Sequence, residues 1–116
     1  MGLDENDTID FLTIAHDGTV TLVLAAYIDD REELETLSLI QKKLNRYFDC
    51  IESGEVFERA SEVAQRTIPS TTPVKIELRT SRGLDGAEGP RFVQHVAAVC
   101  REAGVGFEYR VQPEQW

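Results

Sequence analysis

The chain has 116 residues, of which 41% are hydrophobic and 28% are charged. These values are typical of a soluble globular protein and too apolar for a disordered one, and we expect one α/β domain over residues 1–116 with flexible ends at 1–7 and 112–116. The 12 Lys and Arg residues against 21 Asp and Glu give a net charge of −9. This charge disfavours nucleic acid and anionic membranes as partners, because both attract positively charged surfaces.

Targeting signals are not apparent in the sequence. The opening residues MGLDENDTID are acidic and polar, whereas a secretory signal begins with a basic end and an apolar run. The longest apolar run, from Val20 to Ile28, is too short to span a membrane. Two cysteines are too few for a disulfide framework. We therefore expect a cytoplasmic protein with reduced thiols.

The first predicted element is a β-hairpin formed by residues 9–15 and 20–28. Asp17-Gly18 lies between two apolar runs and suits a two-residue type I′ turn, in which both central residues have positive φ. Counting outward from this turn pairs Ala15 with Val20 and Thr13 with Leu22, on the face that makes the better core. The opposite face then carries Leu12, Ile14, Val23, Ala25 and Tyr27.

Helical patterns follow the hairpin. Asp30 and Glu33 have the spacing of a capping box, and apolar residues recur at helical spacing from Leu34 to Ile51, with Gly54 as a left-handed stop. Residues 55–66 predict a second, shorter helix or a bent continuation. Residues 67–73, with two prolines, end this helical region as a loop.

The second half predicts a strand, a loop, a helix and a strand. Val74, Ile76 and Leu78 alternate with charged residues, residues 81–89 form a glycine-rich loop, and a helix runs from Pro90 to a stop at Gly104. Alternation over residues 105–111 predicts the last strand. The order ββα(α)βαβ favours a four-stranded mixed sheet in a two-layer sandwich of the α+β or α/β class. Because the last two strands alternate cleanly, we expect the helices on one face only.

The segment LIQKKLNRYFDCIESGE resembles a family of short bacterial proteins classed as a domain of unknown function. That family has an apolar hairpin followed by a helix with the pattern Leu-Gln-x-Lys-Leu-Asn-x-Tyr and a later Gly. The matching positions here are Ile40, Gln41, Lys43, Leu44, Asn45, Tyr47 and Gly54. A Trp often found after the family's hairpin is missing, since Ile28-Asp29-Asp30-Arg31 stands there. The resemblance implies the architecture and a bacterial source, and implies no catalytic residues.

The glycine-rich loop is the first candidate for chemistry. Arg82, Gly83, Gly86 and Gly89 lie between a strand and a helix, where backbone N–H groups can bind a phosphate. The spacing matches neither the dinucleotide-binding nor the Walker pattern, and Asp85 and Glu88 would repel a phosphate. A plain crossover loop is therefore the favoured interpretation.

The remaining candidates are single residues. Cys100 lies on the apolar stripe of its helix and Cys50 is next to an acidic residue, so neither is placed like a reactive thiol. His16 and His95 lack ligand spacing to other metal-binding residues. We identify no catalytic, cofactor-binding or metal-ligating set.

The hairpin's outer face gives the leading functional hypothesis. Its five apolar residues would expose roughly 300–500 Å² on a sheet face that is normally polar. We therefore predict a non-enzymatic interaction module, a homodimer or a binder of a protein partner, that uses Leu12, Ile14, Val23, Ala25 and Tyr27. The alternative is a small ligand-binding protein or enzyme that holds a phosphate-type ligand at residues 81–89.

Overall fold

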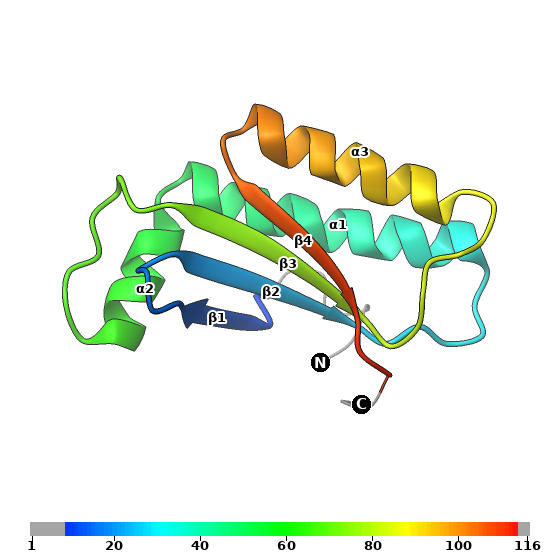
Figure 1. The fold of residues 1–116 in the computed structure, drawn as a ribbon, viewed down its shortest axis with the longest axis horizontal. Coiled ribbons are helices and arrows are strands. Elements are labelled where there is room, and N and C mark those ends of the chain that lie inside the picture. Colours follow the sequence, from blue (N-terminus) through cyan, green and yellow to red (C-terminus); the bar gives the residue numbers. More distant parts are fainter. Residues whose placement is uncertain (1–8, 114–116) are drawn as a thin grey trace.

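The computed structural model describes residues 9–113, which form four strands and three helices (Figure 1). The flexible ends predicted at 1–7 and 112–116 lie largely outside these residues. In chain order the elements are β1 (Phe11–Ile14), β2 (Val20–Ala26), α1 (Glu33–Glu52), α2 (Glu55–Ala64), β3 (Val74–Thr80), α3 (Gly89–Glu102) and β4 (Gly106–Val111).

The strands form one mixed sheet in the order β1-β2-β3-β4. β1 is antiparallel to β2, whereas β2, β3 and β4 run parallel to one another. Each parallel pair is joined through helices, as a crossover between parallel strands requires. The predicted element order and the four-stranded mixed sheet are confirmed.

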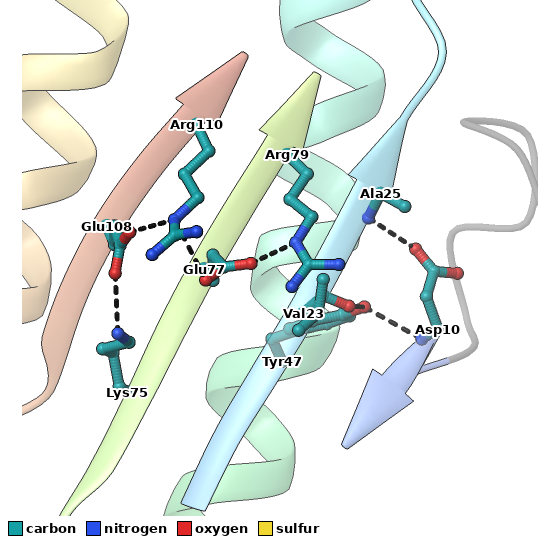
Figure 2. Close-up of polar contacts among 9 residues, drawn as sticks. All are labelled: Asp10, Val23, Ala25, Tyr47, Lys75, Glu77, Arg79, Glu108 and Arg110. Atoms are coloured by element: carbon teal, nitrogen blue, oxygen red, sulfur yellow. Dashed lines mark hydrogen bonds and ion pairs between the residues drawn. The ribbon is translucent and has the colours of Figure 1, made fainter. Parts of the chain in front are cut away.

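The hydrophobic core lies between one face of the sheet and the helices. Alternate residues of β2 and β3 contribute to it, together with side chains from α1, α2 and α3. The intervening residues of β3 and β4 are charged, and in Figure 2 their side chains project from the sheet on the side away from α1. We call this second side the outer face; on β3 and β4 it carries Lys75, Glu77, Arg79, Glu108 and Arg110.

Glycines end the helices where the sequence predicts. Gly54 has a φ of 83° and separates α1 from α2, so the second, shorter helix is confirmed. Gly104 has a φ of 73° and follows α3, where the N–H groups of Gly104 and Val105 bond back to Arg101 and Cys100. A side chain at these left-handed positions would be strained.

The predicted capping box at the start of α1 is wrong. The residue that precedes the helix is Glu32, and no side chain caps its first turn. Asp30 lies two residues further out and is exposed. The Glu33 carboxylate is unavailable for a box because it bonds to the backbone before α3, 55 residues away.

The predicted hairpin register is also wrong by one residue. The turn has three residues instead of two: Ala15 N–H donates to Thr19 O, and Gly18 N–H donates to Ala15 O. Gly18 has a φ of 92°, while Asp17 keeps a negative φ and its carboxylate accepts the Thr19 N–H at 2.9 Å. This turn needs only one residue with positive φ, whereas the type I′ turn needs two, one of them Asp17.

The new register exchanges the two faces of β1. Leu12 lies opposite Leu22 and Ile14 opposite Val20, so both pack against the core. Phe11 and Thr13 take the outer face instead. A slip of one residue reverses every side chain of a strand, and here it buries two large aliphatic side chains that the predicted register left outside.

Candidate functional site

The five residues of the predicted interface do not come together on one surface. Leu12 and Ile14 are half-buried on the core side of β1. Val23 and Ala25 are on the outer face but only 1% and 6% exposed. Tyr27 is the one exposed member. The apolar patch that supported the hairpin-face hypothesis is therefore not assembled.

On β3 and β4 the outer face instead carries a chain of ion pairs (Figure 2). Lys75 Nζ lies 2.7 Å from Glu108 Oε1, Glu108 also bonds Arg110, and Glu77 lies between Arg110 and Arg79. The hydrogen bonds from Lys75 and Arg110 lower the pKa of Glu108. Glu77 at the centre of this chain is buried and paired, whereas the other four charged side chains are partly exposed, so this part of the sheet face is suited to contact with water.

A buried polar cluster, which the sequence did not reveal, fixes the start of β1. Lys43 on α1 and Asp10 before β1 have fully buried side chains, with Nζ and Oδ1 only 2.6 Å apart. Tyr47 Oη accepts the Asp10 N–H and donates to Val23 O, and Asp10 Oδ2 accepts the Ala25 N–H at 3.0 Å. The side chain of Asp10 thus bonds the backbone of β2 at Ala25, just beyond the first residue of β1. Because the cluster is closed to solvent, its role is structural.

The glycine-rich loop is bound by a carboxylate of the protein itself. Glu33 Oε1 accepts the N–H of Glu88 at 3.0 Å, and Oε2 accepts the N–H of Gly89 at 3.2 Å. These amides at the start of α3 are the donors on which a phosphate cradle would depend. In this structure Glu33 already occupies them.

Close contacts within the chain explain why glycine stands at positions 86 and 89 of the loop. A Cβ on Gly86 would lie 1.9 Å from the Glu33 carboxylate, and one on Gly89 would lie 2.0 Å from Leu84 O. Both positions therefore permit a close approach within the chain. The interpretation of residues 81–89 as a plain crossover loop accounts for these glycines without a ligand.

A small cavity nevertheless borders this loop. It measures about 250 Å³ and lies among Arg82, Gly83, Gly86 and the start of α1, beyond the carboxyl ends of β2 and β3. Both arginines at the cavity already bond to the same residue, Asp29. Arg31 pairs with the Asp29 carboxylate at 2.9 Å, and Arg82 donates to Asp29 O at 2.6 Å. The phosphate-type ligand predicted here stays a prediction, with fewer donors than the sequence suggested.

Neither cysteine can serve as a nucleophile. Cys50 and Cys100 are both fully buried in the core. Burial raises the pKa of both thiols, in Cys100 to about 11, so they remain protonated at neutral pH. His16 and His95 are exposed, on the hairpin turn and on α3.

A larger groove lies between α1 and α3, which run side by side in Figure 1. It measures about 490 Å³ and has mainly apolar walls from Leu34, Leu37 and Phe92. Leu34 is 68% exposed, the most exposed large apolar side chain among the described residues. Polar residues complete the lining: Ser38, Gln41, Glu88, Arg91 and His95.

The sequence contained part of this signal. Leu34, Leu37, Ser38 and Gln41 follow the spacing of a single helix stripe, and Phe92 and His95 lie three residues apart on α3. Sequence periodicity assigns apolar members of both stripes to the core. Only the pairing of α1 with α3 shows that Leu34 stays at the surface, in a groove between the helices.

The comparisons with known proteins identify the family. A family model described as "Family of unknown function (DUF6572)" matches residues 1–113. The chain therefore belongs to this family, in agreement with the resemblance seen in the sequence. No curated protein and no solved structure matches it.

Residues 9–113 contain neither a cluster of metal-binding side chains nor a helix able to cross a membrane. No group of three or more His, Cys, Asp or Glu side chains in this range is arranged to hold a metal ion. Within the same range, no helix combines the length and the apolar character needed to cross a membrane.

Proposed function

We propose that this protein is a non-enzymatic interaction module that receives a segment of a partner protein in the groove between α1 and α3. The observation that carries the proposal is the exposure of Leu34, which is 68% accessible on a groove whose other walls include Leu37 and Phe92. A large apolar side chain held open to water beside further apolar surface favours association, since covering it removes that surface from water.

The charges define the partner segment further. Glu32, Glu33 and Glu35 surround Leu34 in the sequence, and Glu88 lines the groove from the other side. Arg91 is the one Lys or Arg in the lining and lies 4.0 Å from Glu88. We therefore propose a short amphipathic segment with two or three apolar side chains for the groove and basic residues beside them.

The hairpin-face interface gives way to this groove as the docking surface. On the hairpin Val23 and Ala25 are buried, and Phe11 and Tyr27 are 41% and 54% exposed, both less than Leu34. The groove instead combines apolar walls, room for several side chains and polar groups at its rim.

Site-specific photocrosslinking tests the proposal. Benzoylphenylalanine is placed at position 34 or, as a matched control, at position 63, where Val63 on α2 is 59% exposed and distant from the groove lining. Irradiation of cells that make the protein should give an adduct to another protein from position 34 only. Mass spectrometry should locate the adduct in a segment rich in apolar and basic residues.

Charge substitutions provide the second readout. Leu34→Glu should abolish capture of the crosslinked partner, whereas Val63→Glu should retain it, with both variants folded by circular dichroism. Equal adducts from positions 34 and 63, or partner capture by Leu34→Glu, would overturn the proposal. An adduct from position 34 only to a second copy of this chain would overturn the choice of partner.

A further inference from the structure

β4 leaves one edge of the sheet open. The strand spans six residues, Gly106–Val111, pairs with β3 on one side, and has no further strand among residues 9–113 on the other (Figure 1). Its pairing with β3 advances one residue at a time, without a bulge, and no proline interrupts it. Bulges and prolines are among the means by which proteins prevent an edge strand from pairing with another chain. The charged side chains of β4, Glu108 and Arg110, are already paired with each other.

The hydrogen-bond pattern shows which backbone groups point to the open side. Gln112 N–H donates to Thr80 O on β3 at 2.9 Å. Because direction alternates along a strand, Arg110 and Glu108 also direct their backbone groups toward β3. Phe107, Tyr109 and Val111 therefore direct their N–H and C=O groups away from β3, toward the open edge.

We propose that two copies of this chain associate through β4, antiparallel, to form one continuous sheet of eight strands. A two-fold axis at Tyr109 places outward-pointing residues opposite one another, as an antiparallel pair requires. In this register Tyr109 lies opposite Tyr109 of the second copy, and Phe107 lies opposite Val111. The proposal is independent of the groove between α1 and α3.

The side chains are complementary in this register. Phe107 and Val111 are both on the core side of β4, and Val111 is 44% exposed in the single chain. On the outer face Glu108 lies opposite Arg110 of the second copy, and the symmetry repeats this opposite-charge pair. We call the line along which the two β4 strands would pair the seam. Pairing there joins the ion-pair chains of the two outer faces, which end at β4 in Figure 2.

The charges also exclude the two nearest registers. An axis at Glu108 places two glutamates directly opposite each other, and an axis at Arg110 places two arginines opposite each other. Like charges at directly opposed positions destabilise a strand pair. Among these three arrangements, only the axis at Tyr109 makes every charged pair attractive.

Charge reversal at the seam tests the proposal. Sedimentation velocity over micromolar to millimolar concentrations should show a dimer of the wild-type chain. Glu108→Arg and Arg110→Glu each place like charges across the seam and should raise the dimer dissociation constant at least about tenfold. The double variant exchanges the two charges and should restore the wild-type dimer.

A mixture provides a sharper readout than either variant alone. Glu108→Arg carries two cations at the seam and Arg110→Glu carries two anions, so the mixed proteins should form a heterodimer although each alone is monomeric. Arg79→Glu is the matched control, since it alters the same ion-pair chain on β3 without touching the edge. It should leave dimerisation unchanged.

Hydrogen exchange on the wild-type chain requires no variant. The amides of Phe107, Tyr109 and Val111 should exchange at least about tenfold more slowly at high protein concentration than at low concentration. A wild-type chain that stays monomeric throughout would overturn the proposal. A dimer that persists in both single variants, or one in which these three amides gain no protection, would overturn it as well.

Discussion

Lys43 places an ammonium group in the interior, where only a paired charge is tolerated. Its side chain and that of Asp10 are both fully buried, and their charged atoms are 2.6 Å apart. Asp10 in turn bonds the Ala25 N–H, and Tyr47 bonds the backbone at Asp10 and Val23. Two charges and one hydroxyl therefore fix the position at which β1 meets β2.

Removal of the Lys43 charge should destabilise the fold strongly. Lys43→Met leaves the Asp10 carboxylate buried without its cation, which should lower the free energy of unfolding by about 3–5 kcal/mol in urea denaturation. Lys42→Met removes the same charge from the neighbouring, exposed position and should change it by less than about 0.5 kcal/mol.

A double variant separates the ion pair from the volume change. Asp10→Asn keeps an acceptor for Ala25 N–H but removes the charge, so its combination with Lys43→Met should recover part of the lost stability. A double variant as unstable as the sum of both single changes would show that the pair is not coupled.

At the scale of elements, Glu33 connects the first turn of α1 to the loop before α3. Its two oxygens accept backbone N–H groups of Glu88 and Gly89, which α3 itself cannot bond because they precede its first complete turn. The Glu33 carboxylate also lies at the N-terminus of α3, the positive end of that helix's dipole. The Glu33 side chain thus fixes the start of α3 against the start of α1, the two helices that form the groove.

Loss of this connection should weaken the fold measurably. Glu33→Ala removes both hydrogen bonds and should lower the free energy of unfolding by about 1–2 kcal/mol. Glu35→Ala, in the same helical turn and exposed, should have an effect near zero. Thermal and urea denaturation measure both variants. If Glu33→Ala and Glu35→Ala lower the free energy of unfolding equally, Glu33 has no specific role. A rise in the wild-type melting temperature with nucleotides or sugar phosphates would show that such a ligand binds the folded chain.

At the scale of the whole molecule, the charges are distributed unevenly. The ion-pair chain of the outer face has three cations and two anions, although the full chain carries a net charge of −9. The acidic surplus therefore lies elsewhere, including the start of α1 beside the groove. The part of the outer face on β3 and β4 is therefore nearly neutral, and the acidic residues at the start of α1 are consistent with the basic partner segment proposed above.

The stability of the whole molecule should fall at alkaline pH. The pKa of the Cys100 thiol is about 11 in the folded chain because of burial, against an ordinary value of 9.0. The folded state therefore holds its proton more tightly than the unfolded state does. The stability that this raised pKa contributes to the fold is complete below pH 9 and is lost as the pH rises toward 11.

Urea denaturation between neutral pH and pH 11 measures this loss, and a Cys100→Ala variant should lose less free energy of unfolding between pH 9 and 11 than the wild type. Burial also raises the pKa of Tyr47, so both proteins should lose further stability above pH 10. Identical pH profiles in the two proteins would contradict the assignment to Cys100.

The sequence by itself determined the elements and their order. Apolar residues repeat at helical spacing in α1 and α3 and alternate in β3 and β4, and Gly54 and Gly104 mark helix ends because they tolerate positive φ. These signals are local, so each can be recognised within a few residues of the chain. The family resemblance rested on the same local pattern around Tyr47.

Only the tertiary structure decided which surfaces and contacts these elements make. The turn at Asp17-Gly18 allows two registers, and the choice between them depends on whether the core can bury Leu12 and Ile14. Glu33 fits a local capping box in the sequence, yet it bonds a loop 55 residues away. The groove beside Leu34 and the open edge of β4 exist only once the helices and strands are packed together. Such features depend on contacts between distant residues, and local periodicity carries no information about those contacts.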